Sequence, residues 1–172
     1  TAVRFPKGAV GTDIPAFERI DGIDILYRGE SADVLLVSIG ALAHVAVDAA
    51  SHAYREGVGV TVVDPRWVKP LPSTLLSMAQ RYKSIVVLED GISHAGIGSA
   101  FSEMLRRENI AIPVHSIGVP LEFIEHSKRA EILSDVGMTS QKIARDIVAW
   151  NSSLKEAMQF QEHESVDRKP IR

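Results

Sequence analysis

The sequence contains no cysteine, which excludes a disulfide framework, a thiolate nucleophile and any metal site built on cysteine. It has no run of about 18 apolar residues, the least that a membrane-spanning helix needs, and its first residues lack the basic and then apolar layout of a signal peptide. Neither charge sign dominates, because 19 basic and 22 acidic residues give a formal net charge of −3. We therefore expect a cytoplasmic protein whose partners include neither nucleic acid nor membrane.

Histidines are few and scattered singly along the chain. No two of the 6 stand at the i, i+4 spacing that zinc sites use on a helix. We expect no metal site.

The length and composition are those of one ordinary domain with short tails, at 172 residues, 45% apolar and 24% charged. The chain opens on TAVRF rather than on Met, and this stretch is typical of a strand that would have no partner. We therefore expect a piece of a longer protein. Residues 8–23 are rich in Gly, Pro and Asp without a sustained period, so we expect residues 1–23 to be the end of a preceding domain and a linker.

Between residues 24 and 152 the sequence alternates strand and helix patterns. Apolar runs predict five strands, at 25–27, 33–39, 58–63, 84–88 and 112–117. Helical spacing and capping residues predict helices at 44–55, 73–81, 98–107, 128–135 and from 139 onward. This alternation indicates an α/β domain with an open, mostly parallel five-stranded sheet and helices on both faces. Residues 153–172 have few apolar anchors, so we expect a frayed or disordered tail.

The stretch SIVVLEDGISHAGIGSAFSEML (84–105) has the strand, glycine-rich turn and helix of many phosphate-binding loops. Its glycines follow the spacing G-x-x-x-x-G-x-G, which is not the dinucleotide fingerprint, and it lacks the lysine of a Walker loop. Glu89 and Asp90 also put negative charge where a phosphate would bind. We interpret the loop as a tight strand-to-helix turn. His94 has no evident nucleophile or orienting acid near it in sequence, so we interpret it as a contact residue rather than a general base.

The stretch DPRWVKPLP (64–72) follows a strand that is expected to be buried. Ligands of open parallel sheets bind beyond the carboxyl ends of the strands, so Asp64, Arg66 and Lys69 are expected at the functional edge. The two basic groups could meet a phosphate or a carboxylate there. In the alternative, which the sequence favours, Arg66 pairs with Asp64 and the prolines stiffen a loop that packs on another domain.

The stretch RFPKG (4–8) places Lys7 on a short, stiff turn, because Pro6 holds Phe5 extended and Gly8 tolerates the turn that follows. Such a lysine suits an anionic ligand, although a solvated lysine fits the sequence equally well.

Several segments occur together in a familiar order and spacing. They are VRFPKG (3–8), VVDPRWVKPLP (62–72), VVLEDG (86–91) with GIGSAFSEML (96–105), and IGVPLEFIEH (117–126) with DVGMTSQKIARDI (135–147). Together they closely resemble the C-terminal part of the 1-deoxy-D-xylulose-5-phosphate synthase family, whose members are transketolase-like thiamine enzymes. The resemblance runs to about Trp150 and implies the fold of the transketolase C-terminal domain. It also implies a transferase that condenses pyruvate with glyceraldehyde 3-phosphate, with loss of CO2, for isoprenoid, thiamine and pyridoxal synthesis.

The resemblance further implies thiamine diphosphate and Mg²⁺ as cofactors of the whole enzyme, bound by domains outside this chain. The implied partners are the enzyme's own N-terminal domains and a second copy in a homodimer. The family's diphosphate signature is GDG followed at a distance by Asn, and it belongs to another domain. Glu89-Asp90-Gly91 departs from it at the first residue, and Asn109 comes too soon. No catalytic, cofactor-binding or metal-binding residue is carried over, and the chain alone is expected to be inactive.

One substrate contact is carried over from the family. A basic residue just before the glycine of RFPKG reaches the phosphate of the aldehyde substrate, and Lys7 occupies that position here. Many relatives have arginine, whereas lysine supplies a compact charge without the bidentate fork. Arg4 is a weaker candidate. Ser127 and Ala95 also depart from the family pattern, at positions that do not touch the chemistry.

Two other assignments remain open on sequence. One is the equivalent domain of a 2-oxoacid dehydrogenase β subunit, which passes an acyl group to lipoamide; the FIEH and VKPL segments argue against it. The other is a stand-alone α/β interaction module without chemistry, which the opening of the chain argues against. Whether the domain serves dimer contact, regulation or structural closure also stays open.

Overall fold

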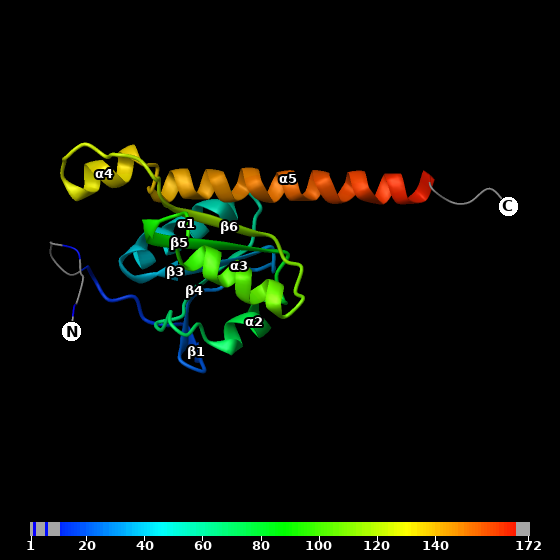
Figure 1. Ribbon diagram of the computed structural model, residues 1–172, viewed down its shortest axis with the longest axis horizontal. Coiled ribbons are helices and arrows are strands. Elements are labelled where there is room, and N and C mark those ends of the chain that lie inside the picture. The colour runs from blue at the N-terminus through cyan, green and yellow to red at the C-terminus, as the bar shows by residue number, and fades with distance from the viewer. Residues whose placement is uncertain (1, 3–5, 7–10, 168–172) are drawn as a thin grey trace.

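A computed structural model describes residues 2, 6 and 11–167 of the chain. One β-sheet forms the centre of the domain (Figure 1). Its six strands are β1 (Glu18–Ile20), β2 (Ile23–Tyr27), β3 (Val34–Ile39), β4 (Val60–Asp64), β5 (Ser84–Ile92) and β6 (Val114–Val119). Their order across the sheet is β1-β2-β4-β3-β5-β6. Strands β4, β3, β5 and β6 run parallel, whereas β2 is antiparallel to β4 and β1 is antiparallel to β2. The α/β class is confirmed.

The expectation of five strands was wrong by one. Strand β1 lies inside the segment 8–23, which was expected to be a linker, and it pairs with β2 as a hairpin. The hairpin turns at Asp21 and Gly22, whose φ angles of 47° and 83° are both positive. An Asp-Gly pair with positive φ at both positions is the favoured two-residue hairpin turn. That dipeptide was the signal that could have located β1.

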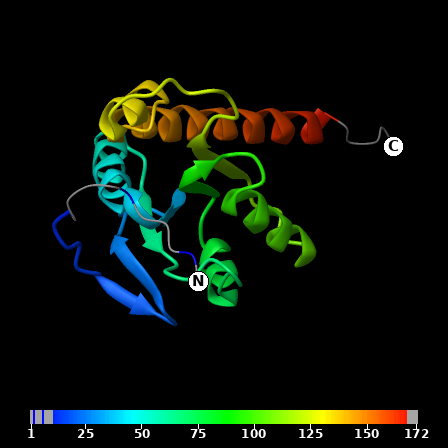
Figure 2. The same ribbon diagram turned by 60° about the vertical axis from the view of Figure 1, so that its left-hand side comes forward.

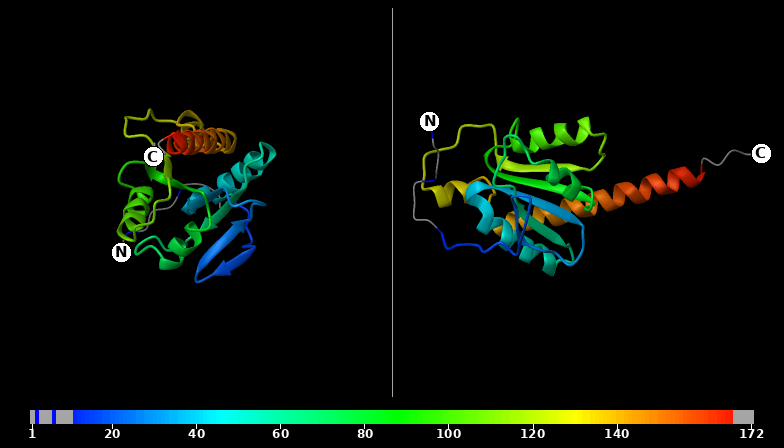
Figure 3. Two further views of the ribbon diagram at one scale, coloured as in Figure 1. Left: turned by 90° about the vertical axis from the view of Figure 1, so that its right-hand side faces the viewer. Right: turned by 90° about the horizontal axis from the view of Figure 1, so that it is seen from below.

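Helices cover both faces of the sheet, as expected. They are α1 (Ala43–Arg55), which follows a short 3₁₀ turn η1 (Gly40–Leu42), α2 (Ser73–Ala79), α3 (Ile97–Arg107), α4 (Arg129–Asp135) and α5 (Ser140–Asp167). Helices α1 and α5 pack on one face, and α2 and α3 pack on the other (Figure 3). Strand β3 supplies both cores: Val34 and Leu36 face the first, while Leu35 and Val37 face the second. This alternation explains its continuous apolar run.

Helix α5 continues well beyond the domain, so the expectation of a frayed tail from residue 153 was wrong as far as Asp167. The helix projects past the strands and the other helices (Figures 1, 2 and 3). Met158 and Phe160 on this projecting part are 60% and 69% exposed, so packing does not hold it. The segment LKEAMQ (154–159) consists of good helix formers, and local propensity extends the helix.

The parallel strands end at one edge of the sheet, at Ile39, Asp64 and Val119, and the antiparallel strand β2 begins there. We call this edge the carboxyl edge. From β3 the chain crosses to β4 on one side and later to β5 on the other, so the topological switch point lies between β3 and β5. Open α/β sheets bind ligands at such points.

Candidate functional site

A surface pocket of about 320 Å³ lies at the switch point. Its lining residues are Pro6, Ile39, Gly40, Ala41, Glu89, Asp90 and Arg129. They come from the ends of β3 and β5, from the start of α4 and from the N-terminal segment. Arg129 forms an ion pair with Asp90 at 2.9 Å, which ties α4 to the end of β5. The pocket therefore combines one arginine with two carboxylates.

The Glu89 carboxylate of this pocket is buried and is bound by the chain itself. It accepts the backbone N–H groups of Ile97 at 3.1 Å and of Gly98 at 3.3 Å, at the start of α3. A helix N-terminus is where a phosphate binds in a nucleotide cradle. Here a carboxylate of the protein holds that position, so the loop does not fit the diphosphate of thiamine diphosphate. This geometry agrees with the interpretation of 89–98 as a tight strand-to-helix turn.

The loop after β4 carries the second set of candidate groups. Arg66 has a left-handed backbone, with φ of 56°, and its N–H donates to Asp64 Oδ1 at 2.7 Å. Its guanidinium Nε lies 3.7 Å from Asp24 Oδ2 on the neighbouring strand β2. The expected pairing of Arg66 with Asp64 thus involves the arginine backbone, while Asp24 is the carboxylate that faces its side chain.

Burial and charge shift the pKa values of the two carboxylates in opposite directions. Burial, followed by the charge of Asp24, raises the pKa of Asp64 despite the N–H of Arg66. Hydrogen bonds from Arg19 lower the pKa of Asp24, and the charges of Arg19 and Arg66 act in the same direction. Sequence reasoning missed Arg19 and Asp24, because β1 was not expected and only the sheet register brings them to Arg66.

The other side chains of this loop, Trp67 and Lys69, lie on an exposed surface rather than in a closed site. Trp67 is 67% exposed, and Lys69 has no ion pair among the residues that the structure describes. The peptide bond between Lys69 and Pro70 is cis. The exposed indole and the free ammonium are available to a ligand or to another domain.

Lys7 and Arg4, the carried-over phosphate contacts, lie outside the described residues. Pro6, which precedes Lys7 in the chain, is described and lines the switch-point pocket. His94 is exposed and lies 3.5 Å from the hydroxyl of Ser93, and no carboxylate is bonded to it in the described part of the chain. Ser127 bonds Glu131 at the start of α4, which is a local helix contact.

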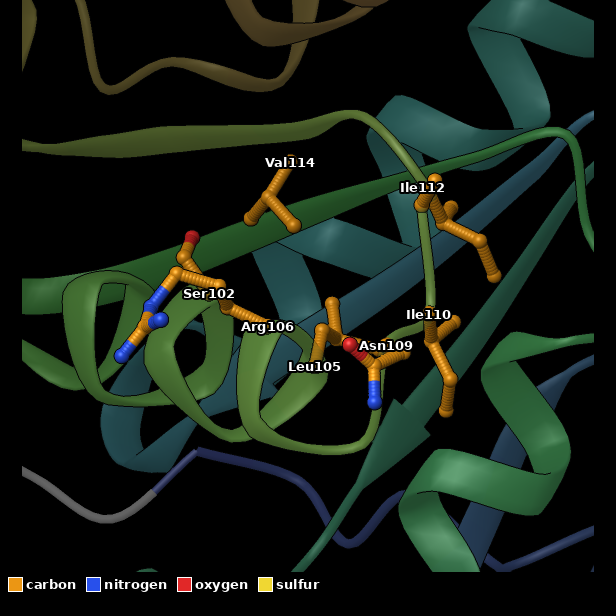
Figure 4. A pocket seen from close by; sticks show the side chains of 8 residues that line it. Ser102, Leu105, Arg106, Asn109, Ile110, Ile112 and Val114 are labelled. Atoms are coloured by element: carbon orange, nitrogen blue, oxygen red, sulfur yellow. The ribbon is translucent and has the colours of Figure 1, made fainter.

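A larger pocket, of about 490 Å³, lies between the end of α3 and the start of β6 (Figure 4). It is at the opposite edge of the sheet from the carboxyl ends. Five of its eight lining residues are apolar: Leu105, Ile110, Ala111, Ile112 and Val114. The guanidinium of Arg106, which also lines it, is bonded to Glu103. Its lining residues carry no carboxyl, imidazole or ammonium group, and the hydroxyl of Ser102 donates to the Gly98 carbonyl oxygen at 2.9 Å.

Across residues 2, 6 and 11–167 there is no group of three or more His, Cys, Asp or Glu residues placed to hold a metal ion. Within the same residues, no helix has the length and apolar character to cross a membrane. The exposed cations of the carboxyl edge, Arg66 and Lys69, are groups that can bind an anion.

Comparison with known proteins places this fold in a family. The family model described as "Transketolase, C-terminal domain" matches residues 24–143. The chain belongs to the transketolase C-terminal domain family.

Its similar proteins include enzymes named 1-deoxy-D-xylulose-5-phosphate synthase. The protein of that name from Mycobacteroides abscessus is 47% identical over 157 residues, or 90% of this chain and 24% of the relative. The one from Mycolicibacterium gilvum is 47% identical over 171 residues, or 97% of this chain and 27% of the relative. The chain thus spans about a quarter of the length of the curated relatives that it matches. A solved split-gene transketolase, described as an inactive β4 tetramer, is 29% identical with a TM-score of 0.67, covering 83% of this chain and 46% of that chain.

Proposed function

We propose that this chain is the C-terminal domain of a 1-deoxy-D-xylulose-5-phosphate synthase. The whole enzyme is a transketolase-like transferase that condenses pyruvate with glyceraldehyde 3-phosphate and releases CO2. The observation that carries the proposal is the 47% identity to enzymes of that name over 90% and 97% of this chain.

The same proposal covers the cofactors and the assembly. Thiamine diphosphate and Mg²⁺ bind to domains outside this chain, in keeping with the carboxylate that holds the helix N-terminus of the 89–98 loop. The whole enzyme acts in the cytoplasm as a homodimer, and this chain packs on its own N-terminal domains.

Within that enzyme, the role of this chain is to bind the phosphate of the aldehyde substrate. Lys7 is the first candidate, and its neighbour Pro6 lines the pocket at the switch point. Arg4 is weaker. Arg66 joins them, because it stands at the same carboxyl edge with its side chain 52% exposed and one carboxylate at 3.7 Å. Holding a remote phosphate orients the reacting aldehyde and lowers the entropic barrier of the condensation.

A lipoamide-dependent 2-oxoacid dehydrogenase remains the alternative of the same fold. Such an enzyme would use a similar domain, but its acyl group would be transferred to a lipoyl partner, whereas the synthase uses an aldehyde as the acceptor. The names of the relatives favour the synthase.

The test uses the full-length polypeptide with thiamine diphosphate, Mg²⁺ and pyruvate. The synthase forms 1-deoxyxylulose 5-phosphate when glyceraldehyde 3-phosphate is added, and the 172-residue chain alone forms none. Acyl transfer to a lipoyl domain without need of the aldehyde would refute the assignment. Turnover by the chain alone would refute the placement of the catalytic groups in other domains.

A further inference from the structure

Four charged residues on neighbouring strands meet at the carboxyl edge, and we call them the edge cluster: Arg19, Asp24, Asp64 and Arg66. The register of β1 with β2 sets Arg19 opposite Asp24, and the register of β2 with β4 sets Asp24 opposite Asp64. Arg66 follows two residues after Asp64. The hairpin β1–β2 therefore brings two charges to the loop that carries Arg66.

Asp24 is shared unequally by its two arginines. Arg19 donates from Nε to Oδ1 and from Nη2 to Oδ2, the latter at 3.0 Å, in the bidentate arrangement that fixes a carboxylate plane. Arg66 Nε lies 3.7 Å from Oδ2, which is an ion-pair distance without a hydrogen bond. Asp24 is thus oriented by Arg19. It attracts the Arg66 guanidinium, whose N–H donors stay free of a hydrogen bond to Asp24.

Arg66 is the member of the cluster whose donors stay available. Its side chain is 52% exposed, while that of Asp24 is 14% exposed. No hydrogen bond from the Arg66 guanidinium to another side chain occurs within the described part of the chain. Its backbone is fixed separately, by the Asp64 carboxylate that accepts its N–H. One carboxylate therefore sets the backbone of Arg66 and another faces its side chain.

We propose that Asp24, oriented by Arg19, is a positioning residue that holds the Arg66 guanidinium at the carboxyl edge for a phosphate monoester. This inference rests on the proposed function. A long arginine side chain loses rotamer freedom when it binds an anion, and a preset orientation reduces that loss. Arg19 also balances the charge of Asp24, and with Asp64 the four charges of the edge cluster sum to zero. The phosphate is therefore bound by the exposed donors of Arg66 rather than by a net positive charge of the cluster.

The test is a double-mutant cycle in the full-length enzyme, with Asp24→Asn, Arg66→Ala and both together. We expect Asp24→Asn to raise KM for glyceraldehyde 3-phosphate about fivefold, the upper range for a partly exposed ion pair. The KM for pyruvate and kcat stay unchanged. In the Arg66→Ala background, Asp24→Asn has no further effect, because its action passes through Arg66.

Two further variants separate positioning from folding. Arg19→Gln changes an exposed side chain and is expected to raise the same KM, again only when Arg66 is present. Glu18→Gln removes the ion pair of Glu18 with Arg28 on the same hairpin and is expected to leave both KM values unchanged.

The outcomes separate the positioning role of Asp24 from the phosphate role of Arg66. If Arg66→Ala raises KM for the aldehyde phosphate while Asp24→Asn and Arg19→Gln do not, the positioning role is overturned and the function stands. Additive effects of Asp24→Asn and Arg66→Ala overturn it as well. If Arg66→Ala leaves that KM unchanged, the phosphate role of Arg66 fails, and the positioning role fails with it.

Discussion

The Glu89 carboxylate accepts the backbone N–H of Ile97 at 3.1 Å, across the loop that joins β5 to α3. The same carboxylate accepts the N–H of Gly98 at 3.3 Å. A loop with the outline of a phosphate cradle thus contains its own anion. This contact argues against cofactor binding by the loop, and we propose that the cations of the carboxyl edge bind the anion instead.

Removal of that anion is expected to weaken α3 and to open its N-terminus. Glu89→Ala should lower the free energy of unfolding by about 1–2 kcal/mol, because it leaves helix N–H groups without an acceptor. Sulfate should then stabilise the variant more than the parent, since a helix N-terminus binds anions. Urea denaturation with and without sulfate measures both effects. Glu122→Ala, at an exposed loop position, is the control. An equal response of parent and Glu89→Ala to sulfate would contradict this role.

A side chain at Gly96 is expected to displace Glu89. A Cβ atom there would lie 2.2 Å from Glu89 Oε1, whereas at Gly91 it would lie 3.4 Å from Oε2. Gly96→Ala should therefore cost about 1–3 kcal/mol of stability through overpacking, and Gly91→Ala should cost much less. Thermal unfolding of both variants checks the difference. Equal melting temperatures would show that the Glu89 carboxylate moves without penalty.

Asp33 is expected to stabilise the amino end of β3. Burial alone would raise its pKa, but hydrogen bonds from Lys83, Ser31 and the N–H of Gly59, with the charge of Lys83, lower the pKa to about 2. A carboxyl whose pKa falls on folding stabilises the native state above the unfolded pKa, here 3.8, and this contribution is lost as the pH falls toward about 2. Asp33→Asn should lower the free energy of unfolding by about 2 kcal/mol at pH 7. The amide N–H groups of the asparagine would face the donors that now bind the carboxylate, without an acceptor between them.

Urea denaturation of the Asp33→Asn variant between pH 7 and pH 2 measures this contribution. Glu103 provides the control, since two arginines lower its pKa to about 2 as well, yet it stands on the exposed face of α3. Glu103→Gln should change stability far less, because solvent screens exposed pairs. A similar loss in both variants would show that burial does not distinguish the two carboxyl groups.

His115 is expected to stay neutral to lower pH than a free histidine. Burial lowers its pKa from 6.5, with a partial counter-effect from Asp146, and its ring lies 5.2 Å from that of Trp150 on α5. As the pH falls below 6.5 the unfolded state binds the proton first, so this residue lowers the stability of the native state on acidification. His115→Phe should reduce that loss. An NMR titration of the His115 ring should give a midpoint below 6.5, and a higher midpoint would contradict the burial argument.

Elements with a strong local signal could be predicted from the sequence. Burial requires apolar residues, and the sequence shows them in three of these elements: the apolar runs of β3 and β5 and the alanine-rich face of α1. Strand β1 could not be located from its three residues, ERI, because its pairing comes from the Asp21-Gly22 turn. The end of α5 was misjudged because a projecting helix needs propensity and no core.

The site was predictable only in part, for a similar reason. The carboxyl-edge rule located Arg66 from the strand that precedes it. Its partner Asp24 is 42 positions away in sequence and reaches it through the pairing of β2 with β4. A contact set by sheet register leaves no mark in the sequence near either residue. Lys7 and Arg4, outside the described residues, stay predictions.

A comparison of two aldehydes tests whether this chain binds the phosphate of the aldehyde substrate. The full-length enzyme and its Arg66→Ala and Lys7→Ala variants are assayed with glyceraldehyde 3-phosphate and with unphosphorylated glyceraldehyde. We expect each variant to lose at least about tenfold in kcat/KM with the phosphorylated aldehyde, the effect of one charged hydrogen bond. Activity with the unphosphorylated aldehyde should not change. Equal losses with both aldehydes, or no loss with either, would contradict the claim.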